Sequence, residues 1–537
     1  MHQYKLAVGL VAAALLAGCG NNSGSAGNQS TKIQFTSQVS FGDSLSDVGT
    51  YAVGGIVALH GGKYTVNSLT PSEQNWTELM AATLSLPAPC AAQTGLDGSS
   101  AYGFAVPTVN HTGCFGYGQG GSRVTLPYGP GNANLPTALG GSPLLGQLTL
   151  PVQMQIQNHL NAIGGKFSGT EVVFVLAGAN DVFVNYATSA VAAGTAAVTT
   201  LVTNQVTADV TAQVTSDIGG GTCTPANAQA TNCQAQAEGE LWAASFSSPT
   251  AEQAAVAAQI GADVAAGTCL PANEATTCPT NAVTELVTAY FGPTGGAATA
   301  AEGELWTASV GGPTAAQAAV AAQVTADVTA GTCVPTDQLA SNCVQPAETE
   351  LVTAYLNAQG SVAGNAAGTS GPGANAAIAA MALAGQQMAG YINTMIVGNG
   401  ATHVVVLNIP DIGTTPFGNA LAPAALTLVN TLVSTYNSNL QTNLASSSAI
   451  LYVDVNTQSH LNTQNPAQYG LTNVTTPACN LTAASNPLGS SLVCNTGNVI
   501  TGDVSNYLFA DTVHPTPYGY SLLAKYVATQ MALKGWI

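Results

Sequence analysis

A serine that could attack a carbonyl carbon follows a short apolar stretch near the start of the chain. Val39-Ser40-Phe41 leads into Gly42-Asp43-Ser44-Leu45, and a Gly-Asp-Ser sequence is typical of a turn at the end of a strand. Open α/β sheets carry their reactive groups at the carboxyl ends of the strands, so this pattern favours Ser44 as a nucleophile. The simpler interpretation is that Asp43, Ser44 and Ser46 only cap the next helix.

A nucleophilic serine needs a base and a group that orients the base. Both are available near the other end of the chain, where Asp511 lies three residues before His514 and two prolines, Pro515 and Pro517, stiffen the turn. At this spacing the carboxylate can hold the imidazole in one tautomer. The sequence therefore predicts that His514 is the base and that Asp511 orients it.

Donors for an oxyanion are expected at two further places. The apolar run 172–177 ends in Gly178-Ala179-Asn180-Asp181, which has the pattern of a buried strand that delivers polar groups at its end. Asn180 can donate from its side-chain amide. Earlier in the chain, Gly118-Gln119-Gly120-Gly121 offers backbone N–H groups that a substrate can approach closely.

The segments that must position these residues alternate between two periodicities. Strand-like runs cover residues 172–177, 404–407 and 450–455, and helix-like runs cover 421–444 and 518–533. Such alternation predicts an α/β fold, with a mostly parallel sheet flanked by helices on both faces. The candidate residues would then meet at the carboxyl edge of the sheet.

These four segments, in this order, resemble the blocks of the GDSL family of serine esterases and lipases, also called SGNH hydrolases. The resemblance implies a three-layer fold, Ser44 as nucleophile, His514 as base, Asp511 as its partner, and an oxyanion hole formed by Ser44, Gly120 and Asn180. It implies no metal and no organic cofactor. The glycine block departs from the usual family pattern, so Gly121 is an alternative to Gly120 as the donor.

The N-terminus has the features of an export signal. A weakly basic start precedes the apolar run Leu6–Leu16, which at about 11 residues is far shorter than the roughly 20 that span a bilayer. Leu16-Ala17-Gly18-Cys19 resembles a bacterial lipobox, which implies cleavage before Cys19 and lipid attachment to it. We expect a signal peptide at 1–18, a flexible tether at 19–32, and an outer-membrane or cell-surface lipoprotein. An ordinary secretory signal with an incidental cysteine is the alternative.

The cysteine count agrees with export. The chain has 11 cysteines, and setting Cys19 aside leaves ten that group by proximity into five pairs. Zinc is disfavoured because short Cys-x-x-Cys spacing is missing and no histidine lies between His159 and His403. Five local disulfides, which need an oxidising compartment, are therefore predicted. The pairs are Cys90/Cys114, Cys223/Cys233, Cys269/Cys278, Cys333/Cys343 and Cys479/Cys494.

Composition restricts the partners. The formal net charge is −18, yet only 6% of residues are charged, so the surface must consist mostly of neutral polar side chains. Nucleic acid is an unlikely partner for such a chain. Basic patches for anionic lipid headgroups are also missing from the composition, so membrane attachment is expected only through the lipid anchor.

An Ala-, Val- and Thr-rich segment, expected at residues 190–395, repeats internally. Residues 237–259 and 301–323 are identical at 18 of 23 positions, and apolar residues spaced four apart predict short helices. We expect a stack of helices, each fastened by its own disulfide, inserted between two parts of a hydrolase core at 33–189 and 396–537. The insertion is interpreted as a structural element or lid, with a substrate- or surface-binding module as the alternative.

The sequence thus predicts a secreted, lipid-anchored serine carboxylic-ester hydrolase that acts on an ester or lipid substrate. An acyltransferase with the same three residues remains open, because an alcohol can replace water in the second half of the reaction. A surface-binding repeat protein with a vestigial core is the alternative from a different class. The complete set of four segments argues against that last interpretation.

Overall fold

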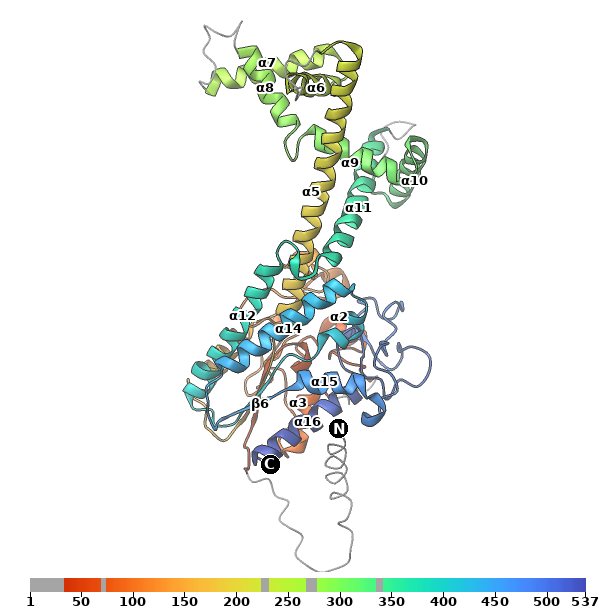
Figure 1. Ribbon diagram of the computed structural model, residues 1–537. Helices are drawn as coiled ribbons and strands as arrows, with labels where there is room; N and C mark the ends of the chain where they lie inside the picture. The colour runs from red at the N-terminus through yellow and green to blue at the C-terminus, as the bar shows by residue number, and fades with distance from the viewer. Residues whose placement is uncertain (1–32, 69–73, 224–230, 267–277, 335–340) are drawn as a thin grey trace, which may run out of the picture.

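The computed structural model describes residues 33–68, 74–223, 231–266, 278–334 and 341–537. The described chain forms a main body that contains a sheet, and a helical arm that projects from it (Figure 1). The predicted signal peptide, the tether, the lipidation site Cys19 and the cysteine Cys269 lie outside the described residues.

The centre of the main body is a four-stranded parallel sheet in the order β1-β4-β5-β6. Nearly every residue of β4 and β5 is apolar and buried, because helices cover both faces. Two of the predicted strands are confirmed almost to the residue, and the third ends early because the Asp454 side chain accepts a hydrogen bond from the Thr457 N–H and begins a helix there. The strands are β1 (Gln38–Gly42), β4 (Val172–Leu176), β5 (Val404–Leu407) and β6 (Ile450–Val453).

Helices pack on the two faces of this sheet and give the predicted three layers. Val173, Val175 and their neighbours in the sheet face one group of helices, whereas Phe174 and Leu176 face the other. The first group is α4 (Val152–Ala162), the start of α5 (Ala179–Gly220), α12 (Ala374–Tyr391) and α14 (Pro423–Asn443). The second group is α3 (Trp76–Thr83) and α16 (Pro517–Lys534). The main body also contains the shorter elements α2 (Gly54–Ala58), β2 (Gln93–Asp97), β3 (Ala105–Asn110), α13 (Pro416–Asn419) and α15 (Val455–Gln464).

The arm begins with α5, which starts directly after β4 and runs for 42 residues out of the main body (Figure 1). Helix α11 (Ser341–Ala367) returns beside it, and the two cross where Gly194 meets Gly360 and Ala190 meets Gly364. A side chain at position 194 or 364 would overlap the backbone of the other helix, so the small residues permit the close crossing. Between α5 and α11 lie α6 (Thr231–Ala244), α7 (Pro249–Ala266), α8 (Cys278–Tyr290), α9 (Gly296–Ser309) and α10 (Pro313–Ala330).

The structure shifts both boundaries of the expected insertion. Position 190 lies in the middle of α5, and residues 374–395 form α12 and the π-helix Ile392–Ile396, whose side chains Met381, Met388 and Ile392 are buried in the main core. The same Ala-rich composition continues from the arm into α12, so composition alone did not reveal where the arm ends. The insertion is therefore anchored in the main body at both ends.

The repeated units share a polar contact that sequence reasoning missed. In each copy a glutamine amide donates hydrogen bonds both to an aspartate four residues later and to a glutamate on a neighbouring helix, at 2.9 to 3.1 Å. Because one NH₂ group bridges two carboxylates, it offsets their repulsion where the helices meet. The four sets are Gln205/Asp209/Glu304, Gln213/Asp217/Glu240, Gln259/Asp263/Glu285 and Gln323/Asp327/Glu350.

Four of the five predicted disulfides are present in the described residues. Two fasten loops of the arm, as expected, and two lie in the main body. The fifth pair includes Cys269 and so falls outside the described residues. The four are Cys90–Cys114, Cys223–Cys233, Cys333–Cys343 and Cys479–Cys494.

Candidate active site

Ser44 lies just beyond the carboxyl end of β1, as the sequence indicated. Gly42, the last residue of β1, pairs with Leu176 of β4, and a side chain at position 42 would overlap the carbonyl oxygen of Leu176. Asp43, not Ser44, caps the short 3₁₀ turn Ser44–Ser46, since its Oδ1 accepts the Leu45 N–H at 3.1 Å. The capping interpretation of Ser44 is therefore unnecessary, and its hydroxyl is available for another partner.

That partner is His514, which lies 470 residues later in the sequence. The distance between Ser44 Oγ and His514 Nε2 is 2.8 Å, and the distance between His514 Nδ1 and Asp511 Oδ2 is also 2.8 Å. The His514 and Asp511 side chains are only 14% and 7% exposed, so water competes little for these hydrogen bonds. The structure thus brings together the three residues that the sequence predicted as nucleophile, base and orienting acid.

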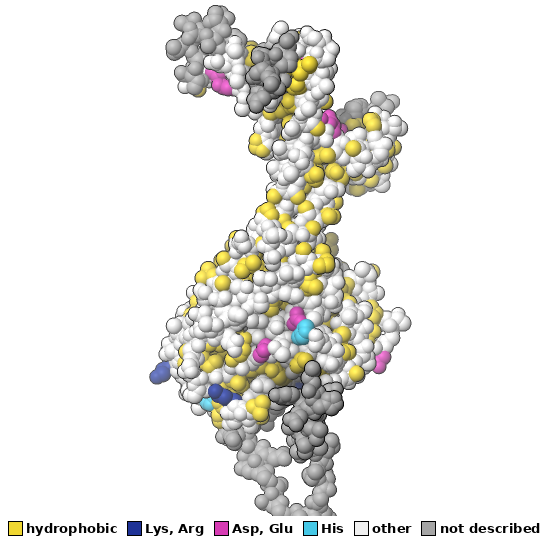
Figure 2. All heavy atoms as spheres, viewed as in Figure 1, with side chains coloured by type: hydrophobic (Ala, Val, Ile, Leu, Met, Phe, Trp, Pro, Cys, Tyr) yellow, Lys and Arg dark blue, Asp and Glu magenta, His cyan; other side chains and the backbone are white. Residues whose placement is uncertain are grey.

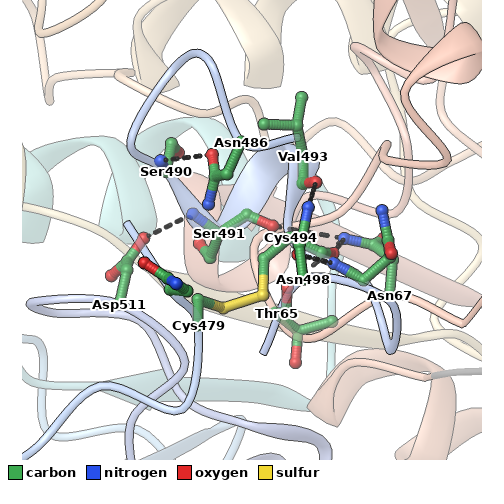
Figure 3. The surroundings of a disulfide bond; sticks show 12 residues. Thr65, Asn67, Cys479, Asn486, Ser490, Ser491, Val493, Cys494, Asn498 and Asp511 are labelled. Carbon is green, nitrogen blue, oxygen red and sulfur yellow. Dashed lines mark hydrogen bonds between the residues drawn. A yellow bond between two sulfur atoms is a disulfide. The ribbon is translucent and has the colours of Figure 1, made fainter. Parts of the chain in front are cut away.

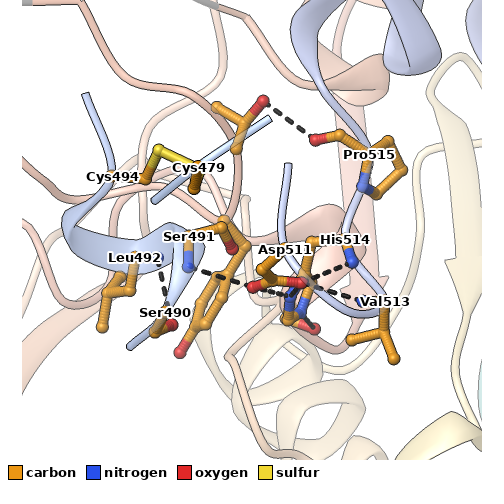
Figure 4. Close-up of polar contacts among 12 residues, drawn as sticks. Cys479, Ser490, Ser491, Leu492, Cys494, Asp511, Val513, His514 and Pro515 are labelled. Atoms are coloured by element: carbon orange, nitrogen blue, oxygen red, sulfur yellow. Dashed lines mark hydrogen bonds and ion pairs between the residues drawn. A yellow bond between two sulfur atoms is a disulfide. The ribbon is translucent and has the colours of Figure 1, made fainter. Parts of the chain in front are cut away.

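The Asp511 carboxylate is surrounded by backbone donors (Figure 4). Its Oδ1 accepts the N–H groups of Val513 and His514, and its Oδ2 accepts the N–H of Ser491 at 3.0 Å. Burial alone would raise the pKa of Asp511, but the adjacent His514 and the hydrogen bonds from Ser491 and Val513 hold this pKa far below its usual range. Asp511 is therefore ionised at neutral pH and accepts from the Nδ1–H of the imidazole.

A disulfide-closed loop supplies the Ser491 donor (Figure 3). Cys479–Cys494 closes the loop, and the Asn67 side chain donates to the carbonyl oxygens of Ser491 and Cys494 at 3.2 and 2.8 Å. Sequence reasoning found the disulfide but not its link to Asp511. The contact joins three segments that are far apart in the chain, and Asn and Ser in loops give no local signal of such a partner.

Asn180 and Asp181 begin α5 directly after β4. The Asn180 side chain is buried, and its Nδ2 donates to the carbonyl oxygen of Ser122 at 2.9 Å, which leaves its second N–H for another acceptor. Asp181 accepts the Val124 N–H and the Arg123 Nε–H, both at 2.9 Å, so it fastens backbone near Ser122 rather than acting as a base.

The structure differs from the prediction that the Gly120 N–H is an oxyanion donor. Its N–H already donates to Asp47 Oδ2 at 3.0 Å, and its carbonyl accepts the Tyr51 hydroxyl, so the amide is engaged within the protein and not directed to an open site. Asp47 also accepts the N–H groups of Gly49 and Thr50, and burial raises the pKa of Asp47 to about 6. The carboxylate therefore ties the Ser44 loop to the glycine segment, which a motif alone does not indicate.

Gln155 of α4 is a further residue that sequence reasoning missed. Its fully buried side chain accepts the Gly42 N–H at 2.9 Å and donates to the Gly42 carbonyl at 2.8 Å, and it also donates to Ser122 Oγ at 3.2 Å. One side chain thereby holds the end of β1 in register with the segment that binds Asn180. In the sequence, the only indication of this role is a glutamine on the buried face of an amphipathic helix.

Asn180→Ala is expected to lower kcat by about 10²- to 10³-fold with little change in KM, as loss of one oxyanion donor does. Steady-state kinetics on a soluble nitrophenyl ester measure this effect. Asn185→Ala is the matched control, because Asn185 lies on the same helix and its amide donates to the Asp181 carbonyl and to Met381 Sδ. Equal losses in the two variants would assign Asn180 a structural role only.

A serine, a histidine and a buried carboxylate linked in this way at the edge of a parallel sheet are typical of serine hydrolases. Across the described residues, no group of three or more His, Cys, Asp or Glu side chains is placed to hold a metal ion. The model of the GDSL-like Lipase/Acylhydrolase family matches residues 275–527, a segment that contains Asp511 and His514 and follows Ser44 and Asn180. This segment of the chain is similar to the GDSL family. No curated protein matches the chain.

Proposed function

We propose that the protein is a carboxylic-ester hydrolase that works through Ser44, His514 and Asp511. The observation that carries the proposal is the 2.8 Å contact between Ser44 Oγ and His514 Nε2, with the ionised Asp511 behind the imidazole. The family match over residues 275–527 supports hydrolase activity in general, because the matched family is described as lipases and acylhydrolases.

In the proposed reaction, His514 Nε2 takes the Ser44 proton as Ser44 Oγ attacks the ester carbonyl. The developing oxyanion accepts hydrogen bonds from the Ser44 N–H and from Asn180 Nδ2, and the Gly120 N–H would join them only if it left Asp47. The imidazolium then gives its proton to the leaving alcohol. Water, activated by the same histidine, releases the acid from the acyl-serine.

An apolar pocket of about 90 Å³ supports an apolar group on the substrate. Its lining includes Leu45, next to the nucleophile, and Val513 and Pro515, on either side of the base. Pockets that hold drug-sized ligands occupy about 300–1,000 Å³, so this one suits a group of only a few carbon atoms. We infer that short-chain esters are turned over better than long-chain esters.

The acyltransferase alternative uses the same residues and is separated by product analysis. Hydrolysis gives the free acid in the presence of an added alcohol, whereas transfer gives a new ester. The vestigial-core alternative is disfavoured by the intact hydrogen bonds from Ser44 to Asp511.

We further propose that the protein is exported and held at the bacterial cell envelope by a lipid on Cys19, with the membrane contacted through this anchor. The lipobox-like N-terminus supports the proposal, and the described disulfides agree with an oxidising compartment. Figure 2 shows few charged side chains on one face of the main body and the arm, as expected for a chain with 6% charged residues.

Removal of the arm tests whether the chemistry resides in the main body. Gly194 and Gly360 touch where α5 and α11 cross, so residues 196–359 can be replaced there by a short Gly/Ser linker. The shortened chain is expected to hydrolyse nitrophenyl acetate and butyrate within about tenfold of the full chain, a change of only about 1.4 kcal/mol in the barrier. The assay uses nitrophenyl esters of increasing length, an acetylated sugar and a phospholipid.

Circular dichroism and a cooperative thermal transition show whether the shortened chain folds. If it folds but has lost activity on small esters, the proposal is contradicted and the arm shapes the site. A selective loss with the phospholipid would instead assign the arm to docking of bulky substrates. The Ser44→Ala variant of the shortened chain is the blank.

A further inference from the structure

The Nε2 edge of the His514 imidazole faces Ser44, and an aromatic side chain packs against the imidazole ring. The Tyr64 ring centroid lies 4.8 Å from that of His514, with an angle of 33° between the rings. Tyr64 is buried, and burial raises its pKa well above the usual value, so the ring is neutral. The contact is therefore between a neutral aromatic face and a base that gains a proton during the reaction.

Several contacts fix the Tyr64 ring in this place. Its hydroxyl bonds to Gln147 Nε2, its carbonyl oxygen accepts the Tyr520 hydroxyl at 3.1 Å, and the next residue, Thr65, donates from Oγ1 to the carbonyl oxygen of Pro515. The Tyr64 segment thus binds the backbone on the far side of His514 as well as the imidazole. A ring held at so many points can restrict the imidazole to one orientation.

Tyr64 also explains the glycine at position 120. A side chain there would overlap the Tyr64 hydroxyl and ring atoms, whereas the Gly120 N–H is used by Asp47. In this structure the absence of a side chain at position 120 makes room for the ring that covers His514. The Tyr64 ring is thus a second reason for a glycine at position 120. The first, given by the sequence, is that a glycine lets a substrate approach the backbone closely.

We propose that Tyr64 is a positioning residue for His514. The Tyr64 ring holds the imidazole toward Ser44 and stabilises the imidazolium that forms when Ser44 attacks. An aromatic face attracts a cation, so the interaction is stronger in the transition state than in the resting enzyme. Among the described residues, Asp511 bonds to His514 at Nδ1, and the buried Asp43 also interacts with His514 through its charge. The proposal rests on the proposed function, because it requires His514 to be the base.

The test compares Tyr64→Phe, which keeps the ring, with Tyr64→Leu, which removes it, by kcat and KM on a soluble nitrophenyl ester across pH. Tyr64→Phe is expected within about threefold of wild type. Tyr64→Leu is expected to lose about 5- to 30-fold in kcat with little change in KM, and the acid limb of its kcat/KM profile should move about half a pH unit lower. Tyr186→Leu is the matched control, since Tyr186 is similarly buried and its hydroxyl bonds to Asn365.

If Tyr64→Leu does not fold, replacement of Tyr64 by pentafluorophenylalanine keeps the ring shape but makes its face electron-poor, and the same downward shift of the acid limb relative to Tyr64→Phe is expected. The proposal would be overturned if the acid limb does not move in a folded Tyr64→Leu or pentafluoro variant. Equal losses of kcat in Tyr64→Phe and Tyr64→Leu would overturn it as well. Ser44→Ala is assayed in parallel. Activity in that variant would overturn the proposed function itself, whereas an inactive Ser44→Ala with an unchanged Tyr64→Leu profile would overturn only the role of Tyr64.

Discussion

Ser44→Ala is expected to lower kcat/KM for a soluble ester by at least about 10⁴-fold, because within the described part of the chain no other hydroxyl is bonded to the base. His514→Ala should lose about as much, and the double variant no more than either single one, since a nucleophile and its base act as a unit. The measurement is the initial rate of nitrophenol release by purified variants. Thermal transitions confirm that each variant is folded.

Ser46→Ala is the matched control for this prediction. Ser46 lies in the same 3₁₀ turn and is also buried, but its Oγ has no hydrogen-bond partner among the described residues. Its variant is expected to stay within about twofold of wild type, as removal of an unpaired hydroxyl leaves no partner behind. Equal losses at Ser44 and Ser46 would mean that the turn, and not the Ser44 hydroxyl, carries the activity.

Asp511→Asn is expected to lower kcat by about 10⁴-fold while KM changes little. The asparagine amide can present a donor to His514 Nδ1, which favours the tautomer with its proton on Nε2, and this tautomer cannot accept the Ser44 proton. The variant also loses the negative charge that stabilises the imidazolium. Because the pKa of Asp511 is held far below its usual range, wild-type activity should not fall through protonation of Asp511 above about pH 4.

Asp454→Asn provides the control for the Asp511 variant. Hydrogen bonds from Thr457 and Asn408 oppose the effect of burial and lower the pKa of Asp454, which caps α15 and has no hydrogen bond to His514 among the described residues. Its variant is expected to lose stability but to keep turnover within about threefold at a temperature where it is folded. If Asp511→Asn behaves in the same way, Asp511 only stabilises the loop that carries His514.

The parts of the fold that could be predicted are those with a strong local signal. Val172–Leu176 and Val404–Leu407 are fully apolar and rich in β-branched valine, which is typical of short strands covered on both faces. Ser44 and Asn180 were predictable because each follows an apolar segment, and parallel strands bring their carboxyl ends to one edge. His514 was predicted from its spacing to Asp511. Cysteine proximity predicted the disulfides because the closed loops are short.

The features that could not be predicted depend on contacts between distant segments. Asn180 and the arm share one helix, because nothing in the Ala-, Val- and Thr-rich sequence after position 190 breaks α5 before Gly221. Three contacts of the site each join residues from separate loops. They are the hydrogen bond from Gly120 to Asp47, the hydrogen bond from Ser491 to Asp511, and the packing of the Tyr64 ring against His514. Periodicity and motif spacing carry no information about such pairs.

Covalent trapping of the nucleophile is the most direct test of the central claim that Ser44 forms an acyl-enzyme. The full chain is incubated with an activated phosphonate ester, which reacts with nucleophilic serines, and the modified peptide is identified by mass spectrometry. The account predicts a single adduct on Ser44, in proportion to lost ester hydrolysis, and no adduct on Ser44 in the His514→Ala variant over the same time. An adduct on a different residue that tracks the loss of activity, or full activity in a chain with Ser44 completely modified, would contradict it.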